Sequence, residues 1–136
     1  MNSIEQTLQL INEEFSIFSD PKDKYVYLID LGKENNGISF DQKNKKNKIQ
    51  GCTSQAWVII DQNNNSYSFK TDSDAMIVKG LLSLIGRVFN GFAKEDILSI
   101  TSDRFLSKAG LHNVVSSQRT NGFGQAINKI QRELED

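Results

Sequence analysis

The only cysteine of the chain, Cys52, is the residue whose type and setting point most directly to chemistry. A single thiol cannot form an internal disulfide bond, and it cannot supply the several thiolates of a metal cage. It is therefore either a buried packing residue, as most free cysteines are, or a reactive thiol. Gly51 precedes it and the polar residues 53–55 follow it, which favours a thiol presented at the mouth of a loop.

The reactivity of a thiol depends on its thiolate form, which nearby positive charge stabilises. Four lysines lie between residues 43 and 48, just before Cys52. On a mobile, hydrated loop, however, salt would screen their effect. A packing role for Cys52 stays open, and it predicts slow alkylation of the native protein.

The remaining residue types argue against several other kinds of site. A cysteine hydrolase needs a histidine base, and the only histidine, His112, stands far along the chain, where we expect it to face solvent or cap a helix. One cysteine and one histidine fall short of the protein ligands that zinc or an iron–sulfur cluster requires. Residues 80–86 lack the Lys-Ser/Thr ending of a phosphate-binding loop. We therefore expect no metal site and no bound cofactor.

Two charged residues farther along are additional candidates. Asp74 lies at the expected start of a helix, where the helix dipole favours a carboxylate. Arg119 also lies near an expected helix start, and this end of a helix disfavours a cation. That position indicates that Arg119 does something other than stabilise its own helix.

Length and composition set the frame for these residues. A chain of 136 residues is most simply one domain, so we expect a single domain over residues 1–136. The net charge of −1 predicts neither nucleic acid nor an anionic membrane as a partner. No apolar run approaches membrane-spanning length, and the N-terminus lacks a secretory signal pattern. A single cysteine fits a reducing compartment, so we expect a cytoplasmic protein, or one of an organelle stroma if a transit peptide has been removed.

Helical patterns open the chain, and a long polar stretch follows them. Residues 4–18 begin after a capping-box pattern and carry apolar residues at helical spacing. Asp20 and Pro21 start a second helix, which we expect to stop at Gly32. Residues 33–50 are polar and have no period, so we expect a long loop that presents the cysteine.

A hairpin comes next, formed by strands at residues 56–60 and 66–70 with a turn between them. Two strands alone are marginal, so we expect a third strand near Ile49 or at residues 38–40. The predicted fold class is α+β, with a small antiparallel sheet of about three strands packed against several helices, because strands and helices do not alternate.

The helix after the hairpin is predicted to be central. Residues 72–74 would cap it, and the residues that follow, up to Phe89, are apolar on nearly all sides. Gly80 and Gly86 lower its helix propensity, so each indicates close approach of another element. The remaining helices are expected at residues 94–98, 102–109 and 123–134.

Four segments, taken in order, carry a family resemblance. Residues 24–32 contain two tyrosines and end in Leu-Gly, and residues 49–57 read Ile-Gln-Gly-Cys-Thr-Ser-Gln-Ala-Trp. Residues 73–81 begin with Ser-Asp-Ala and end with Lys-Gly-Leu, and residues 119–122 read Arg-Thr-Asn-Gly. These segments resemble the motifs of the SufE family, the sulfur-acceptor proteins that work with cysteine desulfurases in iron–sulfur cluster assembly. The resemblance covers nearly the whole chain and implies a SufE/IscU-like fold.

The resemblance also implies a reaction for Cys52. Its thiolate would take the outer sulfur of a persulfide on the desulfurase, as in thiol exchange, stimulate the desulfurase, and pass the sulfur on as a persulfide. The implied partners are a SufS-like, pyridoxal-phosphate-dependent cysteine desulfurase and a SufBCD-like cluster scaffold. A lone cysteine suits a carrier, because a neighbouring thiol would collapse the persulfide into a disulfide.

Other residues are expected to help in this reaction. The resemblance implies a shallow pocket that holds the thiol while its loop is docked. An alternative from another class is a regulatory binding module that activates a desulfurase without carrying sulfur. The candidates for partner binding or loop docking are Gly51, Ser54, Gln55, Asp74 and Arg119.

Overall fold

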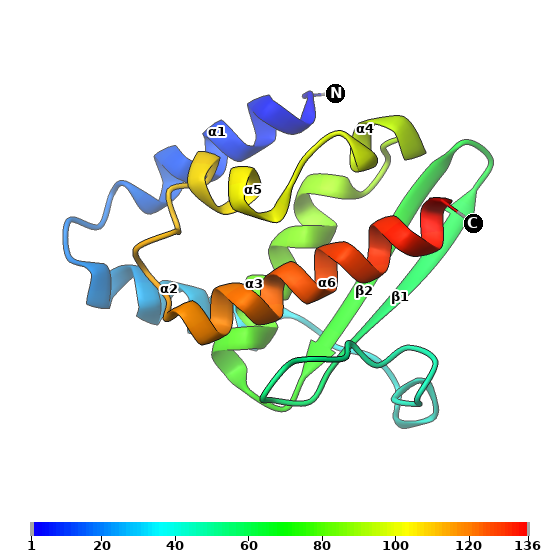
Figure 1. Ribbon diagram of the computed structural model, residues 1–136. Helices are drawn as coiled ribbons and strands as arrows, with labels where there is room; N and C mark the ends of the chain where they lie inside the picture. Colours follow the sequence, from blue (N-terminus) through cyan, green and yellow to red (C-terminus); the bar gives the residue numbers. More distant parts are fainter. Residues whose placement is uncertain (1, 136) are drawn as a thin grey trace.

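The computed structural model describes residues 2–135, which form several helices packed around one hairpin (Figure 1). The predicted α+β class is confirmed. None of the helices in this part of the chain is long and apolar enough to cross a membrane. The elements are α1 (Ile4–Phe15), α2 (Pro21–Glu34), the 3₁₀ turn η1 (Phe40–Gln42), β1 (Ala56–Asn63), β2 (Ser66–Ser73), α3 (Met76–Phe89), α4 (Lys94–Leu98), α5 (Ser102–Lys108) and α6 (Ser117–Glu135).

The first two helices begin where their capping signals predict. The Ser3 hydroxyl accepts a hydrogen bond from the Gln6 amide, and the Gln6 side chain accepts one from the Ser3 amide. The Asp20 side chain caps α2 by accepting a bond from the Lys22 amide. The predicted stop at Gly32 is wrong. Gly32 lies inside α2, where a side chain would collide with the backbone oxygen of Met76 in α3.

The sheet has two strands, with Ala56 opposite Ser73 at one end of the hairpin. The prediction of about three strands is wrong in this detail. Near Ile49 the chain makes a single bridge, between Lys48 and Trp57. It then turns away into residues 50–55, here called the cysteine loop. The other proposed third strand, residues 38–40, runs into the 3₁₀ turn η1 instead.

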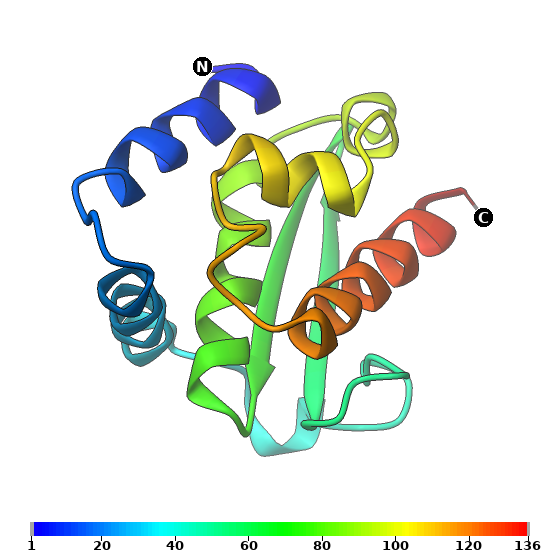
Figure 2. The same ribbon diagram turned by 60° about the vertical axis from the view of Figure 1, so that its left-hand side comes forward.

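Helix α3 is the central element, as predicted. Figure 2 shows it between α2 and the hairpin. Gly80 allows the close contact with α2, because a side chain there would collide with the carbonyl group of Leu28. At Gly86 an added Cβ would lie 3.1 Å from the carbonyl oxygen of Phe69 in β2. Both glycines therefore serve the close approach that their positions predict.

The predicted start of α3 is wrong. Asp72 and Ser73 are the last residues of β2, and α3 begins at Met76, after Ala75. The strand continues past Lys70 because the β1–β2 pairing extends to Ala56 and Ser73. Residues 72–74 thus lie at the end of the hairpin from which the 35–55 segment emerges (Figures 1 and 2).

Candidate functional site

Cys52 lies in a short loop that rests directly on α6. Its half-buried thiol donates a hydrogen bond to the carbonyl oxygen of Gly122, with an Sγ–O distance of 3.6 Å. A Cβ at position 122 would lie 3.3 Å from Sγ, so the missing side chain lets the thiol approach the helix. Gly51 has a φ of +87°, and a Cβ there would lie 3.1 Å from Cγ of Gln125. Gly51 in the loop and Gly122 in α6 therefore let the two elements pack closely together.

A cavity of about 20 Å³ lies beside the thiol. This volume holds roughly one water-sized atom. A pocket of this kind is what the family resemblance implies. It is lined by Cys52, Thr53, Ser54, Val78, Leu81, Leu82, Gln118, Arg119, Gly122 and Phe123.

Burial raises the pKa of the Cys52 thiol. The upstream lysines do not line the cavity. Lys43 is instead paired with Asp72, and the backbone oxygen of Lys46 accepts a hydrogen bond from Lys129. In this position the thiol is partly sheltered, and burial disfavours its thiolate form.

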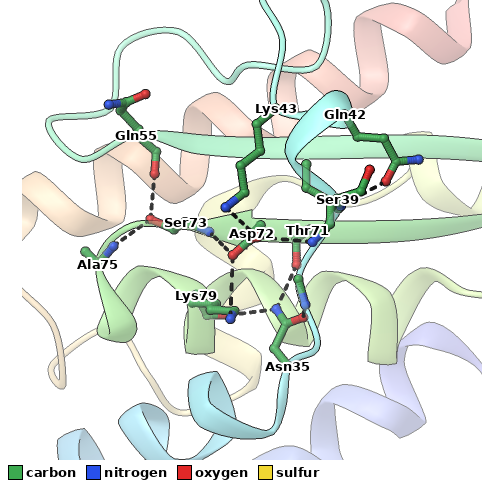
Figure 3. A network of polar contacts seen from close by, with 12 residues as sticks. Asn35, Ser39, Gln42, Lys43, Gln55, Thr71, Asp72, Ser73, Ala75 and Lys79 are labelled. Atoms are coloured by element: carbon green, nitrogen blue, oxygen red, sulfur yellow. Dashed lines mark hydrogen bonds and ion pairs between the residues drawn. The ribbon is translucent and has the colours of Figure 1, made fainter.

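The far end of the cysteine loop is fastened to the end of β2. The Asp74 carboxylate accepts a hydrogen bond from the Gln55 amide at 3.1 Å, and the Asp74 amide donates to the Gln55 carbonyl, also at 3.1 Å. The Ser73 hydroxyl donates to the same carbonyl at 2.7 Å and accepts a bond from the Ala75 amide (Figure 3). Asp74 therefore lies before α3 rather than in its first turn, and it contacts the loop directly.

Arg119 is the third residue of α6, and it lines the cavity. Its guanidinium group makes no ion pair within residues 2–135. Ser54 also lines the cavity, whereas the Gln55 side chain is exposed. The structure thus brings Cys52, Ser54 and Arg119 together, and it links Asp74 to them through Gln55.

Within residues 2–135, neither a histidine base nor a cluster of metal ligands lies beside the thiol. His112 is exposed on the connection between α5 and α6 and does not line the cavity. Within the described residues, no three His, Cys, Asp or Glu side chains gather closely enough to hold a metal ion.

A family model described as the Fe-S metabolism associated domain, SufE, matches residues 9–134. The chain belongs to the SufE family. Membership implies a role in iron–sulfur metabolism. An uncharacterised SufE-like protein of Rhizobium etli is 34% identical over 131 residues, which cover 93% of this chain and 88% of that protein.

Further SufE relatives support the assignment. A SufE-like protein of Synechocystis is 34% identical over 91% of this chain and 77% of its own length. The SufE-like protein 1 of Arabidopsis thaliana, described as chloroplastic/mitochondrial, is 34% identical over 93% of this chain but only 34% of its own length. A solution structure of a hypothetical protein from Thermus thermophilus shares the fold, with a TM-score of 0.76 and 16% identity over 95% of this chain and 93% of that one.

Asp72 is a second buried polar centre of this SufE-family chain, and sequence reasoning missed it. Its carboxylate accepts hydrogen bonds from the amides of Ile38, at 3.0 Å, and Ser73, at 2.8 Å. Lys43 and Lys79 lie 3.4 and 3.6 Å from its two oxygens (Figure 3). Burial by itself would raise the pKa of Asp72, but these hydrogen bonds and the two ammonium groups outweigh burial and lower it.

The contacts of Asp72 change the interpretation of the long polar segment before Cys52. Gly37 has a φ of +69°, and a side chain there would collide with the Asp72 carboxylate. Lys43 also lies over the ring of Trp57, with Nζ 5.3 Å from the centroid. The segment is therefore fastened to β2. The sequence offers only an aspartate two residues before the motif aspartate Asp74, at a strand end where the pattern predicts a helix cap.

Proposed function

We propose that this SufE-family protein accepts sulfur from a cysteine desulfurase as a persulfide on Cys52, stimulates the desulfurase and passes the sulfur to an iron–sulfur cluster scaffold. The main support is the setting of the thiol, which lies in a loop on α6 beside a cavity of about 20 Å³. The loop is held at its ends, by Ile49 paired with Ala56 and by Gln55 paired with Asp74. The partners would be a SufS-like desulfurase and a SufBCD-like scaffold, in the cytoplasm or in an organelle stroma.

The proposed transfer is a thiol exchange that balances without an added oxidant. The Cys52 thiolate attacks the outer sulfur of the persulfide on the desulfurase. A new S–S bond forms on Cys52, the S–S bond on the desulfurase breaks, and the desulfurase cysteine leaves as a thiolate. Because burial raises the pKa of Cys52, the proton is lost more readily once the loop has moved out of the cavity.

The surrounding residues have separate proposed roles. Asp74, with Gln55, holds the base of the loop while its tip moves. Gly51 and Ser54 let the loop return to α6, through the contact with Gln125 and the cavity wall. Arg119 lines the same cavity, where its positive charge would favour an anionic sulfur over a neutral one. A cavity with room for one further atom would shelter the outer sulfur after transfer.

Mass measurement of the intact protein tests the proposal. Wild type is incubated with a pyridoxal-phosphate-loaded desulfurase and free cysteine, and we expect an adduct of one sulfur atom that a reductant removes. Cys52→Ser is the control, because it removes the only thiol. Absence of the adduct on wild type, or an unchanged adduct on the serine variant, would show the proposal to be wrong.

The same samples separate the carrier from the regulatory binding module. A carrier loses its stimulation of the desulfurase when Cys52 becomes serine. A regulatory module keeps it, because binding alone would activate the enzyme. Desulfurase turnover, measured as alanine released with each variant present, decides between the two functions.

A further inference from the structure

Residues 39–48, here called the lysine segment, combine an exposed aromatic side chain with unpaired positive charge. Phe40 is 88% exposed, the highest value among the large exposed hydrophobic residues. Lys45 and Lys46 are exposed and make no ion pair within the part of the chain that the structure describes. The segment holds four lysines and one acidic residue, although the whole chain has a net charge of −1.

The lysine segment is ordered by polar contacts. The Gln42 side chain accepts a hydrogen bond from the Ser39 amide at 3.2 Å, and the Gln42 amide donates to the Ser39 carbonyl at 3.0 Å. The Asn47 side chain donates to the Gln42 carbonyl at 2.9 Å, and the Asn47 amide donates to the Asn44 side chain at 3.1 Å. Contacts of this kind fix where Phe40 stands without burying it.

A buried carboxylate, that of Asp72, also holds the lysine segment in place. Asp72 is 5% exposed and binds the Ile38 amide and the Lys43 ammonium group, on either side of Phe40. Placing a carboxylate in the protein interior is costly unless it is paired. A single exposed hydrophobic residue needs no explanation by itself. Phe40 differs because a buried ion-pair network fixes the backbone on both sides of its solvent-exposed ring. The ring therefore has a defined position, as a binding contact requires.

The lysine segment and the cysteine loop are fastened to neighbouring residues. Asp72 holds Ile38 and Lys43, and the next two residues, Ser73 and Asp74, hold Gln55. Figure 3 shows the contacts of Lys43 with Asp72 and of Gln55 with Ser73. A protein that binds the cysteine loop therefore approaches the end of the hairpin from which the lysine segment also projects (Figure 1).

We propose that the lysine segment is the docking surface for the sulfur donor protein, with Phe40 entering an apolar pocket and Lys45 and Lys46 facing an acidic rim. This inference rests on the proposed function for the identity of the partner. Large aromatic residues are enriched at interfaces and often carry much of the binding energy. Complementary charge around such a contact mainly speeds association and selects the partner.

Binding of a purified, pyridoxal-phosphate-loaded cysteine desulfurase of the same organism tests the surface. We expect Phe40→Ala to raise Kd about tenfold or more, and Phe40→Leu to restore part of the affinity. Ile17→Ala is the matched control, because Ile17 is 79% exposed but lies outside the segment. The melting temperature of Phe40→Ala should equal that of wild type, since the ring is exposed.

Charge reversal at Lys45 and Lys46 tests the electrostatic part of the proposed surface. We expect Lys45→Glu/Lys46→Glu to lower the association rate and to remove most of the salt dependence of binding. Lys22→Glu/Lys24→Glu makes the same change in charge at the start of α2, where acidic residues are favoured. It should leave the association rate unchanged.

The outcomes distinguish this surface from the sulfur-carrying function. If Phe40→Ala and Ile17→Ala bind within about twofold of each other, the docking surface is wrong even when Cys52 accepts sulfur. If binding depends on Phe40 but Cys52 accepts no sulfur, the docking surface stands and the carrier does not. A dimer of the protein alone that Phe40→Ala abolishes, seen by sedimentation, would assign the surface to a second copy and overturn the inference.

Discussion

Gly122 decides how closely the Cys52 thiol approaches α6. The thiol donates to the carbonyl oxygen of this residue, and a Cβ on it would lie 3.3 Å from the sulfur. A contact that close forces the neighbouring group to move. The burial that raises the pKa of Cys52 thus depends on the absence of one methyl group.

Gly122→Ala should make Cys52 more reactive. The added methyl group displaces the loop, burial decreases, and the pKa of the thiol falls toward its ordinary value. We expect the pH–rate profile of alkylation to have a higher midpoint in the native wild type than in the denatured chain, and the variant's midpoint to lie between these two. Gly124→Ala is the control, because its nearest neighbour is Oγ of Ser102 at 3.4 Å. Equal midpoints for wild type and Gly122→Ala would contradict this account.

At the scale of elements, the end of β2 organises the site. Asp72 orders the lysine segment, while Ser73 and Asp74 close the cysteine loop. The two segments have few apolar contacts of their own, with Ile49 as the buried hydrophobic residue between them. Their arrangement therefore depends on a few polar groups at one strand end.

Asp72→Asn should destabilise the protein in a pH-dependent way. Loss of the buried charge leaves Lys43 and Lys79 without their partner, which we expect to cost about 2–4 kcal/mol of unfolding free energy at pH 7. The folded-state pKa of Asp72 is lowered, so its stabilisation is present above the unfolded pKa of about 3.9 and is lost as the pH falls through the folded pKa.

The difference between wild type and Asp72→Asn, measured by urea denaturation, should therefore narrow as the pH is lowered from about 5 toward 2. Asp61→Asn, at an exposed position of β1, serves as the control and should match wild type at each pH. A difference that is constant with pH would exclude the ion pairs as its cause.

Sequence signals were reliable where neighbours in the chain decide the structure. The capping residue Ser3 and the Asp20-Pro21 pair depend on adjacent amides, and both helices begin there. The stop at Gly32 and the helix start at residues 72–74 failed because distant contacts decide them. Gly32 packs on Met76, and Asp72 binds an amide 34 residues away.

The candidate site shows the same division. The sequence singles out Cys52 by its residue type and setting, and it singles out Asp74 and Arg119 by their motifs. In the structure all three lie around the cysteine loop and its cavity. Asp72 gave no such signal, because a buried carboxylate is recognised only by what surrounds it. The role of Gly122 was not predicted either, because it depends on the contact of this glycine with the distant Cys52 side chain.

At the scale of the whole molecule, α3 links the site to the remainder of the fold. Its buried face packs on the hairpin and α2, and Val78, Leu81 and Leu82 reach the cavity beside Cys52. At Gly80 the contact with α2 leaves no room for a side chain beside the Leu28 carbonyl. The cavity wall is therefore part of the main hydrophobic core.

Gly80→Ala should destabilise the whole protein. A methyl group would collide with the Leu28 carbonyl, and backbone cannot move as easily as a side chain, so we expect a loss of about 2 kcal/mol or more. The gain in helix propensity, about 1 kcal/mol, does not offset it. Urea denaturation of Gly80→Ala and Gly124→Ala compares the same substitution at tight and open helix positions. Equal unfolding free energies would show that α2 and α3 separate easily.

The pairing of Asp72 opposite Trp57 and of Ser73 opposite Ala56 has a consequence for how the hairpin can vary in length. Neighbouring side chains of a strand point to opposite faces, so inserting one residue within β2 would exchange the faces of all residues beyond it. Asp72 and Ser73 would then both lose their partners in a single step. The turn at Asn64, at the other end of the hairpin, carries no such constraint, so it is the place where this hairpin can accept added residues.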